Sequence, residues 1–436
     1  MPRNIDVGSQ LAGCPLEGVP KSVVIVGGSL AGLMQGLQLK RLGKDVTILE
    51  RDPSNERSSN EAGIAFGANM VELLRQFDTT GVPVSTPSEF NRFSYRKYSK
   101  DYLKKAEQSL SCWGLLYRVL RANFDGFPSA ACPNPPGPLK GDGRAEYRSG
   151  KLVTALQYRD SAVTVHFEDV TTKKKGTINA DLVIGADGVH STVRKLVLAP
   201  AVEQYPGYIV WRGTVPENTV SIETRQYFSK RVCANMLGDS YCICYVIPTD
   251  NGGFTSEQRL LNWVLYHNVS DNSSEMRDIF TDINGKLHHN TVPRGLVRQD
   301  VWERIRPTFT SRMAAPVADL LAKTDNPFVT KVNDVLCTTA SFCDGRVILV
   351  GDALTTIRPH IAYSTEKAAF HTLSLALVWK GEKTLDAWCR EVAIHAERFS
   401  SISRVMGHLA QGPPTTFLKS LLSYIMLLIR LKLIGR

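Results

Sequence analysis

The residues best suited to bind a phosphate-bearing ligand lie near the N-terminus, directly after a predicted buried strand. Residues 22–26 consist of Ser22 and a continuous apolar run, and Gly27, Ser29 and Gly32 follow with the spacing G-x-S-x-x-G. Gly27 permits a tight turn, Ser29 is small enough to let a pyrophosphate approach the backbone, and Gly32 lets the next helix pack on the strand. Leu30, the next residue of the turn, is a further candidate for cofactor contact. The N-terminus of that helix favours an anion.

An acidic residue stands where such a turn needs one. Residues 45–49 predict a second strand, and Glu50 follows that strand directly. A carboxylate at this position can accept hydrogen bonds from ribose hydroxyls. The order of strand, turn, helix, strand and acid favours dinucleotide binding over an incidental glutamate, although the glycine motif alone is a weak signal because Ser29 replaces a glycine.

Two further clusters follow predicted buried strands. Asp187-Gly188 comes after the run at 182–186, with Arg194 nearby, and Gly351-Asp352 comes after the run at 346–350. Between them, residues 203–335 alternate short strands with helical stretches, which indicates an inserted second domain. No second nucleotide-binding βαβ unit is evident in the sequence.

These three motifs, in this order, resemble those of the single-component FAD-dependent aromatic hydroxylases, typified by para-hydroxybenzoate and salicylate hydroxylases. The resemblance covers most of residues 21–400, and the segments 207–213 and 358–368 are most similar to the 2,6-dihydroxypyridine 3-monooxygenase branch. It implies an α/β fold with a discontinuous, Rossmann-like FAD-binding domain, an inserted mixed-sheet substrate domain and C-terminal helices. The implied divisions are a flexible arm at 1–20, the FAD-binding domain at 21–80, 111–200 and 337–400, the substrate domain at 81–110 and 201–336, and a helical tail at 401–436.

The resemblance also implies how FAD would be held, without a covalent bond. Glu50 would hold the adenosine ribose, Arg118 would contact the phosphates or the ribityl chain, and Asp352 would hold the ribityl hydroxyls. Gly63 lies in the loop expected beside the flavin, and Thr365 lies at the helix N-terminus expected at its pyrimidine edge.

Two features of the sequence allow more than one interpretation: the role of Asp187 and the conformation of the segment after Pro359. The family role of Asp187 spans cofactor and pyridine nucleotide, but the residue is equally suited to capping the next helix. The family pattern Pro-x-x-Gly-x-Gly becomes Pro359, Ala362 and Ser364 here, with the bulky Tyr363 between the last two. Small residues preserve a close approach to the flavin, whereas Tyr363 makes the loop conformation uncertain.

The implied reaction uses NAD(P)H as a transient reductant and O2, and it hydroxylates an electron-rich aromatic or heteroaromatic small molecule through a flavin C4a-hydroperoxide. Arg212 would pair with the developing substrate anion, and Tyr245 would accept or relay its proton. The alternatives are a surface-paired arginine and a packing tyrosine. His360 is a second candidate for the base, and Tyr363 and His360 are candidate substrate contacts.

Two other functions remain open. The same cofactor would serve an epoxidase or oxidase of a larger lipophilic indole or prenylated secondary metabolite, and a non-oxygenating FAD protein would share the nucleotide motifs. Halogenation is disfavoured because the six tryptophans contain no Trp-x-Trp pair.

The net charge and the spacing of the cysteines limit the classes of partner and ligand that we expect. The formal net charge is +10, but the basic residues are scattered without a nucleic-acid-binding pattern, so no nucleic acid is expected. The nine cysteines lack metal-ligand spacing, and we predict no metal and a reduced, cytoplasmic protein. Cys242 and Cys244 share one strand face as core or cavity lining. A homodimer remains open.

The C-terminal tail, residues 415–436, has an uncharged stretch at 421–429 with Lys419 and Arg430 beside it. This stretch is about half as long as a membrane crossing requires. Two interpretations remain: a helix lying in a membrane interface, which would make the protein peripheral, or a helix packed on the FAD domain, which is slightly favoured.

Overall fold

The computed structural model describes residues 20–57, 59–97 and 102–433, so the predicted N-terminal arm lies outside the described residues except for Pro20. The first half of the molecule is built on a six-stranded sheet with the order β19-β20-β10-β1-β2-β6. Its five strands β20, β10, β1, β2 and β6 are parallel, and β19 is antiparallel at one edge. The bounds are Ser341–Phe342 (β19), Val347–Leu349 (β20), Leu182–Gly185 (β10), Ser22–Val26 (β1), Asp45–Leu49 (β2) and Ala145–Arg148 (β6).

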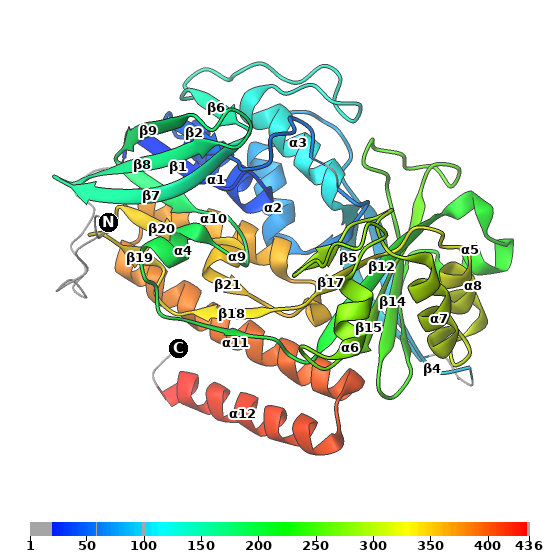
Figure 1. Cartoon of the computed structure of the whole chain (residues 1–436). Coiled ribbons are helices and arrows are strands. Elements are labelled where there is room, and N and C mark those ends of the chain that lie inside the picture. Colours follow the sequence, from blue (N-terminus) through cyan, green and yellow to red (C-terminus); the bar gives the residue numbers. More distant parts are fainter. Residues whose placement is uncertain (1–19, 58, 98–101, 434–436) are drawn as a thin grey trace.

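Both faces of this sheet are covered, which explains its continuous apolar strands. Helices lie on one face, and a three-stranded antiparallel sheet lies on the other (Figure 1). The helices are α1 (Leu30–Arg41), α2 (Ala68–Phe77), α3 (Trp113–Asp125) and α10 (Ser364–Trp379). The covering strands are β7 (Lys151–Arg159), β8 (Ala162–Asp169) and β9 (Lys175–Ala180), and the short helix α4 (Thr192–Leu196) packs against β7.

The second half is a nine-stranded mixed sheet with the order β16-β17-β12-β15-β14-β13-β4-β5-β3. One face packs on helices around the fully buried rings of Trp211, Trp263 and Trp302. The strands are β3 (Gly63–Phe66), β4 (Thr86–Tyr95), β5 (Tyr102–Cys112), β12 (Tyr208–Pro216), β13 (Arg231–Met236), β14 (Tyr241–Ile247), β15 (Leu260–Asn268), β16 (Thr291–Val292) and β17 (Phe328–Lys331). The helices are α5 (Ile222–Phe228), α6 (Ser274–Phe280), α7 (Gln299–Thr310) and α8 (Ala315–Ala322), with the 3-10 turn η1 (Glu217–Thr219).

A third set of elements joins the two halves. A small sheet combines β11 (Ala201–Gln204), β18 (Asp334–Cys337) and β21 (Thr355–Thr356). The long helix α11 (Leu385–Gln411) runs beneath both halves, and α12 (Pro414–Leu433) packs along it (Figure 1). The short elements α9 (Gly351–Leu354) and η2 (Pro359–Ile361) lie between β20 and α10.

Two expected domain limits fall inside structural units. Residue 400 lies within α11, because the helix continues unbroken from 385 to 411. Residues 63–66 form β3, which pairs with β5 and so completes the nine-stranded sheet, although we assigned them to the FAD-binding domain. The rest of the domain division stays a prediction.

Arg194 links the second and third sequence motifs. Its side chain is 2% exposed, donates hydrogen bonds to Val189 O (2.7 Å) and Ala353 O (2.8 Å), and forms an ion pair with Glu203 (2.6 Å). The two carbonyls belong to the loops after β10 and β20, so one buried guanidinium fixes the spacing of these loops.

Arg194→Met should lower the free energy of unfolding by about 2–4 kcal/mol, because two buried carbonyls lose their donor. Denaturant unfolding measures this change. Lys195→Met is the matched control, since Lys195 is the exposed neighbour on the same helix; it should change stability by less than about 0.5 kcal/mol. Equal stability of the two variants would contradict the linking role.

Candidate flavin and substrate site

The predicted phosphate turn lies at the carboxyl ends of the parallel strands. Gly27 has φ +101°, and a Cβ there would lie 2.5 Å from the Ala186 carbonyl oxygen, so this position requires glycine. Leu30 begins α1, and Ser29 at its N-cap makes no side-chain capping bond. A Cβ on Gly32 would lie 2.0 Å from Gly27 O. The turn therefore packs tightly and leaves the first N–H groups of α1 available to an anion.

Glu50 is placed at this turn. Its carboxylate is buried and accepts hydrogen bonds from the backbone N–H of Gly28 (2.8 Å) and of Asp52 (2.9 Å). Arg57 lies 3.5 Å away as an ion-pair partner. Backbone donors thus fix the orientation of a carboxylate at the edge of a cavity, which is the geometry that ribose hydroxyls need.

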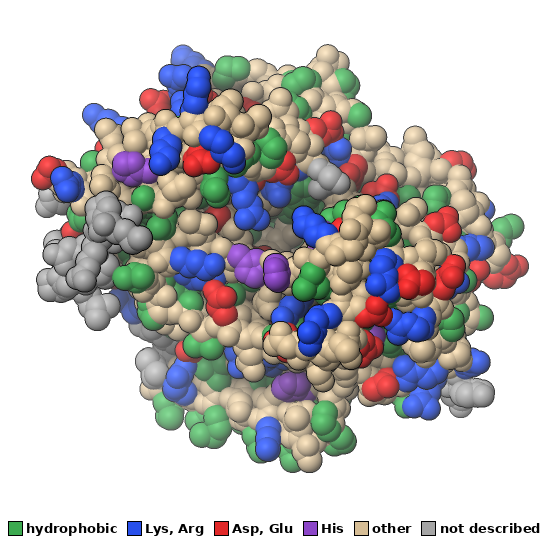
Figure 2. Space-filling view, viewed as in Figure 1, with side chains coloured by type: hydrophobic (Ala, Val, Ile, Leu, Met, Phe, Trp, Pro, Cys, Tyr) green, Lys and Arg blue, Asp and Glu red, His purple; other side chains and the backbone are tan. Residues whose placement is uncertain are grey.

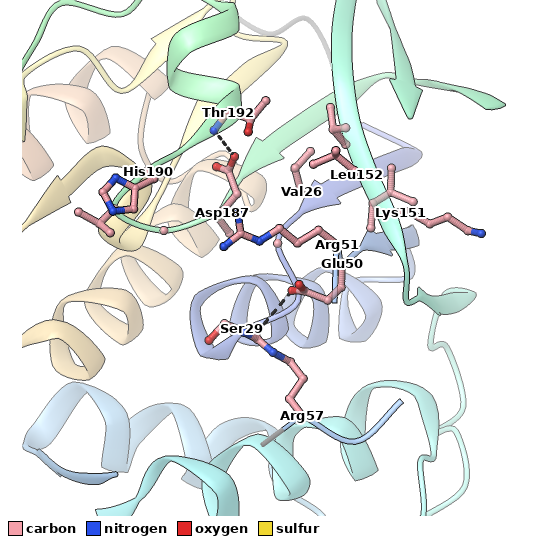
Figure 3. Close-up of a pocket in the computed structure, with 16 residues that line it drawn as sticks. Val26, Ser29, Glu50, Arg51, Arg57, Lys151, Leu152, Asp187, His190 and Thr192 are labelled. Atoms are coloured by element: carbon pink, nitrogen blue, oxygen red, sulfur yellow. Dashed lines mark hydrogen bonds and ion pairs between the residues drawn. The ribbon is translucent and has the colours of Figure 1, made fainter. Parts of the chain in front are cut away.

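A cavity of about 260 Å³ opens beside this turn. Figure 3 shows Glu50, Arg51 and Asp187 at the cavity, with β7 residues Lys151 and Leu152 on its far side. Figure 2 shows a hollow near the centre of the corresponding face with basic and histidine side chains at its rim. A cavity that combines apolar walls with a helix N-terminus, acids and basic residues suits a nucleotide, whose base, phosphates and ribose need these different partners.

Asp187 performs the capping function that we left open. Its carboxylate accepts hydrogen bonds from Ser191 Oγ (2.5 Å), Thr192 N (2.6 Å) and Val193 N (3.1 Å) at the start of α4, as Figure 3 shows for Thr192. Burial raises the pKa of this carboxyl, against the lowering effect of these bonds. Asp187 also lines the cavity, so capping does not exclude contact with a cofactor; that contact stays a prediction.

Asp352 has a partner that the sequence motifs did not reveal. The ammonium of Lys367, whose side chain is fully buried, lies 2.7 Å from Asp352 Oδ1 and also donates to Thr355 O. The Asp352 side chain is 38% exposed, so its other oxygen remains accessible. The available signal was a Glu-Lys pair in the first turn of a helix that is otherwise without acidic residues, lysine or arginine. Gly351 N donates to His371 Nδ1 (3.1 Å), and burial lowers the pKa of His371, which keeps that nitrogen an acceptor.

The start of α10 carries a second unpredicted residue, Glu366. Thr365 is the second residue of this helix, as expected for a helix terminus. The adjacent Glu366 accepts hydrogen bonds from Gly67 N (2.9 Å) and Asn69 N (2.8 Å), and so caps α2. Ala362 adopts φ +50°, the left-handed conformation that the family glycine would supply freely.

Tyr363 packs against α11. Its ring stacks on Phe399 with 4.0 Å between centroids, and its hydroxyl lies 3.1 Å from His395 Nε2. These contacts account for the bulky side chain at this position; contact with a substrate stays a prediction. Arg118 likewise has protein partners: it binds Glu56 Oε1 (2.8 Å) through Nε and lies 3.2 Å from Asp250 Oδ2. Its contact with FAD also stays a prediction.

Arg212 and Tyr245 lie on the same face of the nine-stranded sheet. Arg212 on β12 is opposite Val264 on β15, and Tyr245 on β14 is opposite Asn262 on β15. Tyr245 and Asn262 are buried, with 6% and 1% of their surface exposed. Strand pairing therefore brings a cation, a phenol and an amide together.

This group also holds the segment at 62–64, which we expected to be a loop beside the flavin; the structure instead places Gly63 and Ile64 at the start of β3, where they pair with β5. Arg212 Nη2 donates to Gly63 O (2.8 Å), and Gly63 N donates to Asn262 Oδ1 (3.1 Å). A Cβ on Gly63 would lie 2.5 Å from Asn262 Cγ, so only glycine fits. Both predicted residues, Arg212 and Gly63, are therefore in direct contact, and Asn262 is the residue that sequence reasoning missed.

Two buried donors in this group, Arg212 Nε and Asn262 Nδ2, make no hydrogen bond of good geometry among the described residues, although both side chains lie near enough to the Tyr245 hydroxyl to lower its pKa. Unpaired buried donors are costly, so each calls for an explanation, and a bound acceptor is one such explanation. Both side chains contact Gly63, so this position is a candidate for the acceptor oxygen of a ligand.

His360 is buried in an aromatic cluster on the same sheet face. Its Nε2 lies 2.9 Å from Tyr208 Oη and its Nδ1 lies 2.5 Å from Tyr241 Oη. Tyr266 stacks on both Tyr241 and His360. Burial lowers the pKa of His360 to about 3, so the ring is neutral near pH 7. Cys242 and Cys244 point to the opposite face and are core residues with Sγ atoms 3.7 Å apart.

The comparisons with known proteins agree with these features. Residues 21–83 match the FAD binding domain family, and residues 205–334 match an FAD binding domain-like family. The 2,6-dihydroxypyridine 3-monooxygenase of Paenarthrobacter nicotinovorans is 28% identical over 369 residues, covering 82% of each chain. The 6-hydroxynicotinate 3-monooxygenase of Pseudomonas fluorescens is 25% identical over 404 residues, covering 88% of this chain and 89% of the other.

Solved structures match over nearly the whole chain. The 2,6-dihydroxypyridine-3-hydroxylase from Arthrobacter nicotinovorans has a TM-score of 0.74 and 25% identity, covering 92% of this chain and 94% of that one. The chain fits the FAD-dependent aromatic hydroxylase family. A Klebsiella pneumoniae protein complexed with FAD and uric acid has the same fold, with a TM-score of 0.64 and 17% identity over 93% of this chain and 92% of that one. The predicted family resemblance and fold class are confirmed.

The residues present suit the FAD of this hydroxylase family. The cavity beside Glu50 and the free N–H groups of α1 match an adenosine and a pyrophosphate, and the accessible oxygen of Asp352 matches a ribityl hydroxyl. The chain is thus a flavoprotein, and the contacts of Glu50, Asp187 and Asp352 with its FAD stay predictions.

Asp352→Ala should weaken FAD binding at least about tenfold, because a charge-assisted hydrogen bond worth roughly 1.5–3 kcal/mol is lost. It should also lower stability by about 3 kcal/mol, because the buried ammonium of Lys367 loses its counter-ion. Flavin fluorescence titration and unfolding of the apoprotein measure the two effects.

The double variant Asp352→Ala/Lys367→Met separates these effects. Removing both charges should restore most of the stability while FAD binding stays weak. Tight FAD binding by the double variant would show that Asp352 serves only the ion pair and that the third motif has been misinterpreted.

Proposed function

We propose that the protein hydroxylates an electron-rich aromatic or heteroaromatic ring, using NAD(P)H, O2 and noncovalently bound FAD. The observation that carries this proposal is the pair of unpaired buried donors, Arg212 Nε and Asn262 Nδ2, beside Tyr245 and the loop at 62–64. Such donors suit a ring oxygen that carries negative charge, which is the oxygen that activates an aromatic carbon for hydroxylation.

Arg212 would hold this oxygen as an anion. A guanidinium in a site closed to water stabilises an oxyanion more strongly than it would in solution. Its hydrogen bond to Gly63 O fixes the guanidinium, so no reorganisation is needed when the substrate binds. The ring of Phe328, 5.7 Å from the guanidinium, gives the site an apolar wall against which a flat ring can pack.

Tyr245 would donate a hydrogen bond rather than accept a proton. Burial raises the pKa of Tyr245, and the nearby charge of Arg212 opposes this rise only in part. The phenol is therefore protonated near pH 7. This favours the relay function of Tyr245, in which it donates to the substrate oxygen, over the function of a base.

His360 is less suited to be the base. Both of its ring nitrogens already contact tyrosine hydroxyls, and its low pKa makes it a weak proton acceptor. The site therefore favours substrates whose oxygen is acidic enough to bind to Arg212 already ionised. When bound, reduced FAD supplies the oxygen-activating chemistry, and the surrounding sheet face excludes water.

Hydroxylated pyridines are the first substrate class to test. They are flat, their ring oxygens ionise readily, and two relatives are named for 2,6-dihydroxypyridine and 6-hydroxynicotinate. A panel of hydroxypyridines, phenols and indoles should be incubated with NADH or NADPH while oxygen uptake is followed. Product mass and structure would distinguish ring hydroxylation from epoxidation, and a lack of oxygen uptake with the whole panel would favour a non-oxygenating FAD protein.

Arg212→Ala should reduce product formation at least about tenfold, equal to roughly 1.4 kcal/mol of transition-state stabilisation, while FAD content stays unchanged. Product per NAD(P)H consumed is the measurement. Thr214→Val is the matched control, because Thr214 also anchors the loop, through Glu61 (2.7 Å), but adds no cation. Wild-type turnover in Arg212→Ala would remove Arg212 from the reaction.

Acid precipitation should release all of the flavin into the supernatant, since hydrogen bonds and ion pairs account for the expected contacts. The absorbance of supernatant and pellet measures the partition. Yellow colour retained in the washed pellet would indicate a covalent attachment.

A further inference from the structure

The C-terminal helix α12 has apolar residues on two opposite faces. One stripe, at the spacing of an amphipathic helix, packs toward α11 and includes Phe417, Tyr424 and the buried Leu431. The second stripe points away from the protein. Its members are large, exposed side chains: Leu418 (55%), Leu422 (54%), Ile425 (43%), Met426 (63%), Ile429 (47%) and Leu433 (83%).

This outward stripe is unusual for the surface of a protein. At about 100° per residue these six side chains fall within an arc about 100° wide, so they form one continuous face about 23 Å long. Met406 and Leu409, near the end of α11 from which the chain turns into α12, are also exposed (39% and 56%). Contiguous apolar patches of this kind indicate an interaction surface.

The charges around the stripe identify the kind of partner. The segment 414–433 contains no acidic residue, and Lys419 and Arg430 lie beside one edge of the stripe while Lys432 lies beside the other. Arg430 also forms an ion pair with Glu397 of α11, which anchors the helix. Figure 2 shows apolar and basic side chains along the lower edge of the molecule, where Figure 1 places α12.

We propose that the outward face of α12 docks the protein on an anionic lipid bilayer. An apolar stripe bordered by lysine and arginine suits a helix that lies in the membrane interface, with its apolar side chains among the acyl chains and its basic side chains at the headgroups. A second copy of this chain fits less well, because pairing two such faces would bring like charges together. The formal net charge of +10 adds a long-range attraction to an anionic surface.

Among the residues that the structure describes, no helix is long and apolar enough to cross a membrane. The geometry proposed for α12 is parallel to the surface, with α11 between it and the flavin half of the protein.

Vesicle flotation with the full-length protein tests this proposal. Wild-type protein should float with vesicles of phosphatidylcholine and phosphatidylserine at low salt, and at least several-fold less with phosphatidylcholine alone or at high salt. The variant Leu422→Ser/Ile425→Ser/Ile429→Ser keeps every charge but removes the centre of the stripe, and its binding should fall at least tenfold.

The matched control is Leu198→Ser/Val202→Ser/Ile222→Ser, which replaces three similarly apolar side chains that are 68%, 69% and 65% exposed elsewhere on the surface. It should bind vesicles like the wild type. FAD content and thermal unfolding of each variant check that the fold is intact. Lys419→Glu/Lys432→Glu should abolish the preference for the anionic lipid.

Three outcomes would overturn the proposal. Equal flotation of the two triple variants would show that binding is non-specific electrostatics. If the wild type does not float but forms a dimer, and the stripe variant is a monomer, then a second copy of the chain occupies the stripe. Absence of both would leave α12 without a function at a lipid surface.

Discussion

The parallel pairing of β20, β10, β1 and β2 is the constraint on which the half of the molecule built on the six-stranded sheet depends. Because the register is parallel, the carboxyl ends of all four strands meet at one edge of the sheet, and the loops after them carry Gly27, Glu50, Asp187 and Gly351. No single loop could form the nucleotide cavity. Arg194 then fixes the distance between two of these loops by donating to a carbonyl in each.

The phosphate turn after β1 and the acid after β2 could be predicted from the sequence. Gly32 is required by a contact within one βαβ unit, Gly27 by its positive φ in the same turn as well as by its contact with Ala186, and the acid at position 50 follows from the length of the unit, so short-range spacing was sufficient to place all three. Alternation in residues 241–247 likewise predicted a strand that carries Tyr245, and the family-like run at 207–213 placed Arg212 in the inserted domain. Their mutual proximity could not be deduced, because it arises from pairing both strands with β15, a segment with no motif of its own.

The residues missed by sequence reasoning share one physical property. Lys367, Glu366 and Asn262 are polar side chains whose partners lie far away in the chain: Asp352, the N-terminus of α2 and Gly63. Sequence patterns report periodicity and local turns, whereas a buried polar residue is explained only by its partner. A Glu-Lys pair in the first turn of α10 is the most that the sequence offered. The predicted boundary at residue 400 was wrong for a different reason. The helix continues through this residue, and nothing in the sequence nearby interrupts it.

Gly63, at the start of β3, contacts two side chains from other strands of the same sheet, Arg212 and Asn262. The loop at 62–64 is bound on both sides of Gly63, by Arg212 at its carbonyl and by Asn262 at its amide. The same two side chains present unpaired N–H groups. Any ligand oxygen that binds these donors therefore acts on side chains that also fix the loop expected beside the flavin. Under the proposed function, substrate binding and the position of Gly63 would be coupled through these two residues, and a ring that does not engage Arg212 would leave their buried donors unsatisfied. Selectivity for a ring that carries an anionic oxygen would follow from that energetic cost, independently of the shape of the cavity.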